Sequence, residues 1–489
     1  MTFVCIALVW LTGFSIARFL FPTPSRWSLH SVFLFSLGTG LGIGIASCVY
    51  FLSLVLFGPS PLILAGFGAI VSAAAILRGM SAKSRGIALE WAAGPATPGY
   101  LTGLLLLTAA FAVTMFVVHS LEKPHGEWDA WSIWNLKARF LFRGSERWKN
   151  ALSTQMPNSH PDYPLLLPSI VAMCWTLARA ESISAPIAVA FLFTLGACGL
   201  LISSIGILRG KTQALGAGIV VLATSSFIQL GAMQYADVPM SFYILATLAL
   251  LCLQDRFSSE LRFSIAAGLA AGFAPWTKNE GWLFLAAVLL ARLTAILRFD
   301  SRAVLGPQFL RFAAAALPSV ALTAFFKLRF APPNDLFAQK ASDLAAHVAV
   351  FGRWIITLEG FVKMLFLMGG FLLPIGLILG LYWFLVRFHV EERDRTPVAT
   401  VLLTIGLMLA GEFAVYVVFP PDIVTQLNVS LERLCMQLWP AGLLAFFLVA
   451  NPPQLVTLRP VRSKHDVKSQ KAKLRVQPPK PAHPPVRLN

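Results

Sequence analysis

The residues of this sequence that could do chemistry gather in polar stretches between long apolar runs. The first stretch, residues 122–144 (EKPHGEWDAWSIWNLKARFLFRG), carries Asp129 among three tryptophans. Trp128, Trp131 and Trp134 recur every three residues, so they share one helical face that suits the headgroup layer of a membrane. An interfacial anchor helix explains the tryptophans. It does not explain Asp129, whose carboxylate would lose hydration at that surface and could serve as a general base.

Basic residues follow Asp129 on the same stretch. Lys137 and Arg139 could bind a phosphate group, because neighbouring cations match its charge. Contact with lipid headgroups is the alternative. The stretch continues as NSHPDYPLLLP, in which His160 and Asp162 could ligate a metal, although two residues do not make a metal site. The alternative to a metal site is a structural role, in which this segment starts a helix with proline in its first turn.

Two later polar stretches connect apolar runs. In MQYADVPMSFY, Asp237 opens a spanning helix with Pro239 in its first turn, where an aspartate commonly acts as the N-cap. In WTKNEGWLF, Lys278, Asn279 and Glu280 form a compact polar turn. This turn could simply connect two helices, or it could contact a sugar or a phosphate group.

The last polar stretch, NVSLERLCMQLWP, places Arg433 at the mouth of the final apolar run. An arginine at such a position can extend its charged end toward the membrane surface. It can also bind an anionic group held between helices. Glu432 beside it is a candidate to neutralise its charge.

Composition sets the elements that must position these residues. Of 489 residues, 57% are hydrophobic and 12% are charged, about half the charge density of soluble domains, and the mean hydropathy is +0.72. This excludes a soluble enzyme, a disordered chain and a collagen-like chain. The fold class is therefore all-α and polytopic in a membrane. The net charge is +17, and the basic residues lie in short loops between apolar runs. This distribution is typical of residues that set the orientation of a protein in the membrane, so we expect no nucleic-acid partner.

A spanning helix needs roughly 20 apolar residues. Residues 164–180 are short and contain two prolines, so we interpret them as an interfacial helix. We expect 13 spans, at 2–21, 29–56, 60–77, 99–119, 184–208, 213–231, 237–254, 262–275, 281–298, 310–330, 360–387, 398–418 and 434–450.

With this topology most basic loop residues fall on one side, which is then cytoplasmic. A domain of residues 1–454 would span the membrane, and the basic, proline-rich tail 455–489 would be cytoplasmic. The exterior loops would be residues 120–183, 232–236, 276–280, 331–359 and 419–433. We expect Asp129, Asp237, Lys278 and Arg433 to converge on one cavity at the outer membrane surface. The sequence contains no phosphate-binding or dinucleotide-binding glycine motif, and the six cysteines show no disulfide or zinc spacing.

The order of these motifs resembles the GT-C superfamily of integral-membrane glycosyltransferases. An aspartate in the first exterior loop is followed by an H-P-x-x-P-type interfacial helix and by A-D-x-P at the start of a later span. The bacterial relatives of protein O-mannosyltransferases and aminoarabinose transferases are the most similar. The resemblance covers roughly residues 99–290, with a weaker echo at 430–433. Many relatives have Asp-Glu in the first loop, where Ala130 follows Asp129 here.

The resemblance implies catalytic roles for Asp129 and Asp237 and a donor-phosphate contact for Arg433. Lys137, Arg139, Lys278 and Glu280 are further candidates for substrate binding. Glu127, His160 and Asp162 are additional candidate site residues. The sequence assigns no cofactor, and it leaves open whether the site binds a divalent metal.

The expected activity is transfer of a sugar from a polyprenyl-phosphate donor to a lipid, glycan or protein hydroxyl. The expected place is the periplasmic face of a bacterial inner membrane, among membrane lipids. Such a donor leaves as a stable phosphate, so one base and several cations suffice. The alternative function is a transporter or flippase of lipid-linked sugars, which would carry ionisable residues along a path in mid-membrane.

Overall fold

The computed structural model describes residues 1–22, 29–58, 60, 66, 73, 89–94, 96–300, 302–334, 341–370, 375–419 and 422–451. All of them lie in one compact unit, Met1–Pro452. Over these residues the chain is helical and forms no strand. The expected span 60–77 lies almost wholly outside the described residues, as does the tail 455–489.

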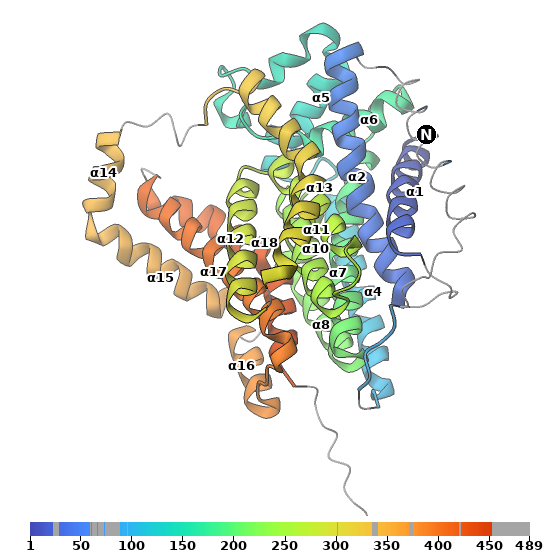
Figure 1. Ribbon diagram of the computed structural model, residues 1–489. Helices are drawn as coiled ribbons and strands as arrows, with labels where there is room; N and C mark the ends of the chain where they lie inside the picture. Colours follow the sequence, from blue (N-terminus) through green and yellow to red (C-terminus); the bar gives the residue numbers. More distant parts are fainter. Residues whose placement is uncertain are drawn as a thin grey trace, which may run out of the picture. The chain divides into compact units, whose positions relative to one another are not determined.

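Long helices follow one another along the chain, as Figure 1 shows. The helices are α1 (Thr2–Leu20), α2 (Leu29–Phe57), α4 (Gly99–Glu122), α5 (Asn135–Arg143), α6 (Leu166–Ala178), α7 (Ser184–Arg209), α8 (Lys211–Ala223), α9 (Ser225–Ala232), α10 (Asp237–Arg256), α11 (Arg262–Thr277), α12 (Glu280–Phe299), α13 (Arg302–Arg329), α14 (Ala341–Ala349), α15 (Phe351–Leu367), α16 (Ile375–Val386), α17 (Arg395–Val418) and α18 (Ile423–Val449).

Nine of the described helices are long and apolar enough to cross a membrane, or up to eleven spans if each of two bent helix pairs counts as one. The chain is thus a multi-pass membrane protein by length and composition. The expected number was 13. One expected span, 60–77, falls outside the described residues, and α11 has only 16 residues.

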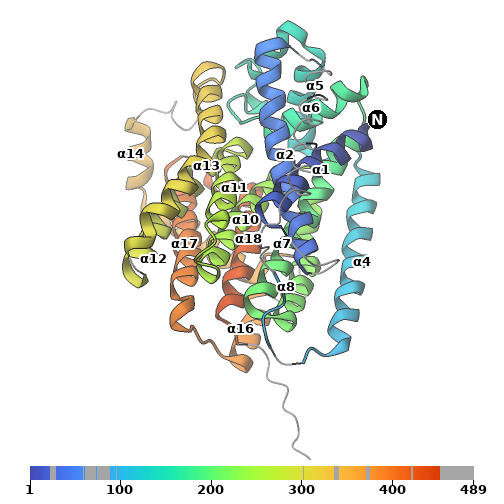
Figure 2. The same ribbon diagram turned by 45° about the vertical axis from the view of Figure 1, so that its right-hand side comes forward.

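Helix α10 lies at the centre of the bundle, where α7, α11 and α18 pack against it (Figures 1 and 2). The apolar window of α10 is entirely buried, whereas that of α4 is 11% buried. A helix that is apolar on every side belongs in the interior of a bundle. Asp237, the first residue of α10, is therefore held on the most enclosed element of the fold.

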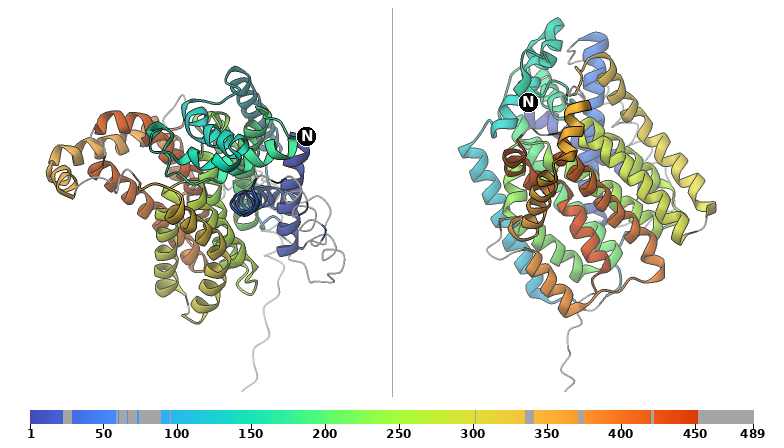
Figure 3. Two further views of the ribbon diagram at one scale, coloured as in Figure 1. Left: turned by 90° about the horizontal axis from the view of Figure 1, so that it is seen from above. Right: turned by 90° about the vertical axis from the view of Figure 1, so that its left-hand side faces the viewer.

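Helix α2 supports the segment between α4 and α7, and the view from above shows α2 beside this segment (Figure 3). Ser47 Oγ donates to the carbonyl of Leu166, 2.9 Å away, and Tyr50 Oη donates to the carbonyl of Leu141 at 3.3 Å. Helix α1 packs closely against α2: a Cβ on Gly13 would lie 1.9 Å from the carbonyl oxygen of Gly38. Small residues at helix contacts allow such close backbone approach in membranes.

Two expected spans are broken helices. Residues 213–231 form α8 and α9, which meet at Thr224 with a bend of 61°. Residues 360–387 contain the end of α15 and all of α16, and α15 begins at Phe351. Part of the expected loop 331–359 is therefore helical, as α14 and the start of α15. Hydropathy averaged over a window reports apolar content and is insensitive to a local break in the backbone.

The expected loop 419–433 is also wrong, because α18 begins at Ile423. Asp422 caps the helix by accepting a hydrogen bond from the backbone N–H of Thr425 at 3.2 Å. Ile423, Leu427 and Leu431 recur every four residues and are buried in one apolar cluster. Polar residues on the other faces lower the average hydropathy and conceal this apolar stripe.

The expected interfacial helix 164–180 is α6, whose 13 residues are too few to span a bilayer. The three tryptophans, however, do not share one exposed face. Trp128 and Trp131 are exposed, whereas Trp134 is 2% exposed and packs on Tyr163. Residues Ala130–Trp134 form a π-helical turn, whose wider winding rotates Trp134 inward relative to an α-helix.

Candidate active site

The turn between α9 and α10 holds the segment that carries Asp129. The backbone N–H of Glu127 donates to the carbonyl of Met233 at 3.3 Å. The Gln234 side chain donates to the carbonyl of Pro124 and accepts from Asn135, at 3.2 and 2.9 Å. These contacts from Met233 and Gln234 to Pro124, Glu127 and Asn135 therefore fix the approach of Asp129 to the start of α10.

Gly126 makes this approach possible. Its φ is +74°, a conformation that costs little only for glycine. A Cβ at this position would lie 2.5 Å from the Ala130 Cβ and 2.6 Å from the Met233 carbonyl oxygen. The chain can therefore turn into the π-helical segment beside Asp129 only without a side chain here.

Asp237 is buried at the start of α10 and accepts hydrogen bonds from three side chains. Its Oδ1 accepts from Gln437 at 2.7 Å and from Lys278 at 3.2 Å. Its Oδ2 accepts from Arg433 at 3.0 Å. The N-cap interpretation of Asp237 is wrong, because Ala236 occupies the N-cap position and Asp237 is the first helical residue. The carboxylate faces the helix bundle.

Arg433 joins the two aspartates. Its Nη2 lies 2.5 Å from Asp129 Oδ2 and 3.0 Å from Asp237 Oδ2. The Tyr235 ring packs against the guanidinium, with its centroid 4.5 Å from Cζ. The Asp129 and Arg433 side chains are 17% and 20% exposed, whereas that of Asp237 is 1% exposed. Asp237 is thus the buried anchor of Arg433, and Asp129 is its accessible partner.

Lys278 follows the C-terminus of α11 and contacts two carboxylates. Its Nζ lies 3.2 Å from Asp237 Oδ1 and 2.8 Å from Glu280 Oε1. Burial alone would lower the pKa of Lys278, but Asp237 and Glu280 more than offset this and hold the pKa above its usual range. Lys278 therefore stays charged at neutral pH, where these carboxylates are ionised.

The structure brings together Asp129, Asp237, Lys278, Glu280 and Arg433, which the sequence had singled out. Three carboxylates face two cations in this cluster. An anionic ligand can bind there only by replacing a carboxylate at one of the cations. At Arg433, Asp129 is the carboxylate more easily replaced, because it is 17% exposed against 1% for Asp237, and Arg433 is its only cationic partner among the described residues.

A second cluster, centred on Asp162, adjoins the first through the α11–α12 turn. Asp162 Oδ2 accepts hydrogen bonds from Asn279 at 2.8 Å and from Asn334 at 3.0 Å. Lys327 lies 3.4 Å from the same oxygen and donates to Asn279 Oδ1 at 2.6 Å. Asn279 follows Lys278 directly, so one turn presents a side chain to each cluster.

Tyr163 lies between the two clusters. Burial raises the pKa of Tyr163 above its usual range, and the carboxylates of Glu280, Asp162 and Asp129 add to this effect while Lys278 opposes it. The His160 ring stacks on the Tyr163 ring at 4.6 Å. Sequence reasoning missed Tyr163, although its place between Asp162 and a proline was a usable signal.

The described contacts of Lys137 and Arg139 are with groups other than the aspartate pair. Lys137 Nζ donates to the carbonyls of His160 and Tyr163 at 2.6 and 3.4 Å. Burial lowers the pKa of Lys137 to about 7, with Asp162 opposing the shift. Arg139 lies 3.6 Å from Glu181, which also binds Arg143.

Glu127 and Glu432 likewise have other partners. Glu127 lies 3.5 Å from Lys123 and 3.9 Å from His119. Glu432 accepts from Ser226, while its neighbour Arg433 binds the two aspartates. The expectation that Glu432 neutralises Arg433 is therefore wrong. The residues are adjacent on α18, but successive helical side chains point about 100° apart.

A divalent metal does not fit between the two aspartates. Arg433 bridges their carboxylates and Lys278 takes the remaining side of Asp237, so cations of the chain fill the place of a metal. Among the described residues, no group of three His, Cys, Asp or Glu side chains is arranged to hold a metal. His160 and Asp162 also lack a third such ligand within this part of the chain.

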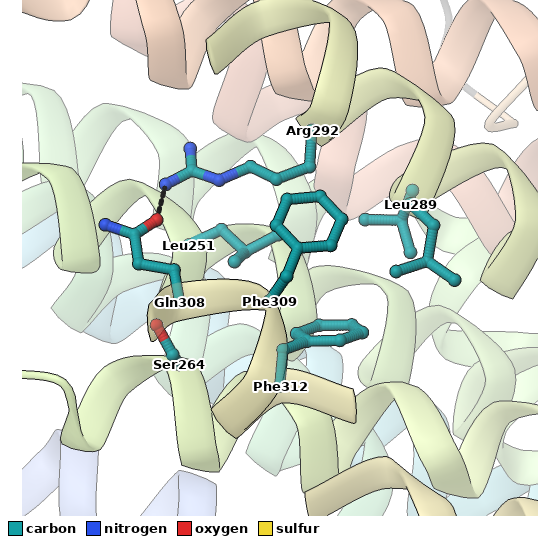
Figure 4. A pocket seen from close by; sticks show the side chains of 8 residues that line it. Leu251, Ser264, Leu289, Arg292, Gln308, Phe309 and Phe312 are labelled. Atoms are coloured by element: carbon teal, nitrogen blue, oxygen red, sulfur yellow. Dashed lines mark hydrogen bonds between the residues drawn. The ribbon is translucent and has the colours of Figure 1, made fainter. Parts of the chain in front are cut away.

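The opposite end of α10 carries a separate polar cluster. Arg292 binds Asp255 through both terminal nitrogens, at 2.8 and 2.5 Å, and donates to Gln308 at 2.8 Å. Figure 4 shows Arg292 and Gln308 beside Phe309 and Phe312, around a cavity of about 10 Å³. A cavity of this size holds one water and no substrate. We interpret the cluster as a structural tie between α10, α12 and α13.

No family model matches this chain, and neither a curated protein nor a solved structure matches it significantly.

Proposed function

We propose that this protein is a membrane glycosyltransferase with a GT-C-like fold. It would transfer a sugar from a polyprenyl-phosphate donor to a hydroxyl of a lipid, glycan or protein. The reaction would occur at the periplasmic face of a bacterial inner membrane, with the C-terminal tail in the cytoplasm. The observation that carries this proposal is the position of Arg433 between a buried aspartate, Asp237, and an accessible one, Asp129.

The change in charge during the proposed reaction supports an exchange of Asp129 for the donor phosphate at Arg433. In the donor, the phosphate is a diester that joins the sugar to the polyprenyl chain. When the sugar is transferred, the polyprenyl phosphate leaves as a monoester, and its phosphate gains one negative charge. Its phosphate would replace Asp129 on the guanidinium, because Asp237 keeps Arg433 in place from the buried side. Lys278 would add a second cation nearby. Interactions that strengthen as negative charge develops lower the barrier to reaction.

The same exchange would prepare the base. Once released from Arg433, the Asp129 carboxylate would accept the proton of the acceptor hydroxyl as its oxygen attacks the anomeric carbon. The bond between that carbon and the phosphate oxygen breaks, and the phosphate leaves without needing a proton. Asp237 remains bound to Gln437 and Lys278 and acts as a positioning residue.

The first test removes the gene and compares envelope glycolipids and glycoproteins by mass analysis. We expect one sugar to disappear from one class of molecule, to return with the wild-type gene and to stay absent with Asp129→Asn. Restoration by Asp129→Asn to the wild-type level would remove the assigned base. An unchanged glycan profile in the deletion strain would argue against the transferase assignment.

Transport of a lipid-linked sugar is the second candidate, and a different observation favours it. Two helix pairs, α8 with α9 and α14 with α15, are bent by 61° and 71°. Interrupted helices often surround transport sites. Purified protein in liposomes separates the two functions, because a transporter moves the labelled lipid-linked sugar across the bilayer and makes no new glycosidic bond.

A further inference from the structure

Glu412 is a buried carboxylate that the exchange at Arg433 does not use. It lies on α17, six residues before the end of that helix at Val418, and is 6% exposed. Within the part of the chain that the structure describes, Glu412 forms no hydrogen bond and no ion pair. A buried charge without a partner is costly, so an ionisable residue of this kind in a membrane helix indicates a functional site.

The buried stripe of α17 turns Glu412 toward the interior of the bundle. Val401, Met408 and Tyr416 are buried on this helix, whereas Leu402 is exposed. Met408, Glu412 and Tyr416 follow one another at intervals of four residues, and Val401 lies seven residues before Met408. Residues at these intervals share one helical face. The Glu412 carboxylate therefore lies on the inward face of α17.

The inward face of α17 meets the candidate active site. Helix α17 packs against α12 and α18 (Figure 1). A Cβ on Gly411 would lie 2.6 Å from Leu283 Cδ2, so the small residue next to Glu412 lets α12 approach closely. The charged side chains that act on Glu412 are Glu280 and Lys278, from the turn that leads into α12. Glu412 thus extends the cluster around Lys278 on the side of α17.

With Glu412 included, the carboxylates of this cluster outnumber its cations. The carboxylates are Asp129, Asp237, Glu280 and Glu412, and the cations are Lys278 and Arg433. Each cation already contacts two carboxylates, and neither contacts Glu412. A phosphate would be repelled at Glu412, because like charges repel strongly where water is scarce. A ligand group that donates hydrogen bonds would be attracted, because a carboxylate only accepts them.

The oxygens of Glu412 can be reached by a small group. Several completely enclosed side-chain atoms lack a hydrogen-bond partner, such as Ser241 Oγ, but the Glu412 oxygens are not among them. Because Glu412 also has no partner, its oxygens keep some accessible surface. The carboxylate is therefore an unused acceptor that borders open space, and it is not sealed into the packing of the bundle.

We propose that Glu412, together with Glu280, recognises the sugar of the lipid-linked donor by accepting hydrogen bonds from its hydroxyl groups. This inference rests on the proposed function, and it applies to transfer and to transport alike. The donor phosphate would lie at Arg433. Lys278 connects the two places, because it contacts both Asp237, the anchor of Arg433, and Glu280. A site with buried polar groups rejects ligands that leave these groups unpaired, so Glu412 would select for the sugar.

The test compares two ligands of the purified full-length protein. One is polyprenyl phosphate that carries the sugar lost in the deletion strain, and the other is polyprenyl phosphate alone. Glu412→Gln should weaken binding of the first about 10–100-fold, the usual contribution of a hydrogen bond to a charged group. It should leave binding of the second unchanged, because that ligand has no group for Glu412. Glu359→Gln is the matched control, because Glu359 is exposed on α15 and pairs with Lys363 at 2.8 Å.

The unfolding temperature separates recognition of the sugar from a structural role. Glu412 has no partner to lose in the described part of the chain, so Glu412→Gln should be at least as stable as the wild-type protein. A marked fall in its unfolding temperature would overturn the proposal.

Glu412→Asp provides a second variant, which keeps the charge and shortens the side chain by one methylene. It should also weaken only the ligand that carries the sugar. Equal weakening of both ligands, or unchanged binding of the sugar-bearing ligand to both variants, would overturn the role of Glu412. If the wild-type protein binds neither ligand, the proposed function itself fails, and this inference fails with it.

Discussion

Arg433 Nη2 lies 2.5 Å from Asp129 Oδ2, although the two residues are 304 positions apart. The contact joins the segment after α4 to the last described helix of the chain. Both of its side chains are partly accessible, whereas Asp237 and Lys278 in the same cluster are buried. A ligand that reaches the cluster from solvent therefore meets this pair first.

Asp237→Asn should destabilise the protein much more than Asp129→Asn. Asp237 is 1% exposed, and its removal as an anion leaves Arg433 and Lys278 without their shared partner. Loss of one member of a buried ion pair costs about 3–5 kcal/mol, whereas an accessible pair contributes about 1 kcal/mol or less. Unfolding temperatures of the two purified variants check the order. Equal losses would contradict the assignment of Asp237 as the buried anchor.

Asp129→Asn should reduce sugar transfer by about 10²–10⁴-fold, the usual contribution of a general base. Its hydrogen bond to Arg433 can persist, because the amide oxygen still accepts. Glu127→Gln is the matched control, since Glu127 lies two residues away and pairs with Lys123. Transfer from a synthetic polyprenyl-phosphate sugar to membrane acceptors is the measurement. A similar loss in both variants would point to a disturbed loop and not to a lost base.

Arg433→Lys should abolish most activity although it keeps the positive charge. The planar guanidinium contacts both aspartates and stacks on Tyr235. A lysine ammonium is a point charge that cannot reproduce this fork. We expect a higher KM for the donor together with a lower kcat, because the same group would bind the phosphate in the ground state and in the transition state. A normal KM would exclude Arg433 from donor binding.

Lys137 should make the stability of the protein rise with pH. Burial lowers its folded-state pKa to about 7, whereas an unfolded lysine titrates near 10.5. Between these values the unfolded chain binds more protons, so raising the pH favours the folded state. The neutral amine retains two N–H groups for the carbonyls of His160 and Tyr163.

Lys137→Met should flatten this dependence between pH 7 and about pH 9. Unfolding temperatures of wild-type protein and variant across that range are the measurement. Lys363→Met is the control, since Lys363 is exposed and pairs with Glu359 on the same helix. A wild-type stability that falls as the pH rises through this range would contradict the prediction.

Gly126→Ala should disturb the candidate site from a position that carries no functional group. Its φ of +74° and the two close atoms leave no room for a Cβ. We expect a loss of about 1–3 kcal/mol, the usual cost of a strained backbone conformation, together with reduced activity. Gly103→Ala is the matched control, because Gly103 lies within α4 with open space around it. That change should be neutral or slightly stabilising.

The sequence by itself determined the membrane class, most of the long helices and the polar residues that are candidates for a site. Long apolar runs are a local property, and α7, α10 and α17 follow them closely. The polar residues Asp129, Asp237, Lys278 and Arg433 stood out because charge in such a chain is rare and costly. Local patterns also hid some features, as at 419–433, where an apolar stripe every fourth residue is diluted by polar neighbours.

Only the tertiary structure decided which of these residues meet. Gln437 was no candidate from the sequence, yet it completes the partners of Asp237 because α18 crosses the start of α10. Lys137 was a candidate phosphate ligand, yet the packing of α5 turns it toward the carbonyls of His160 and Tyr163. Contacts across a bundle depend on how helices rotate and cross, and the side chains that set this rotation are spread over the whole chain.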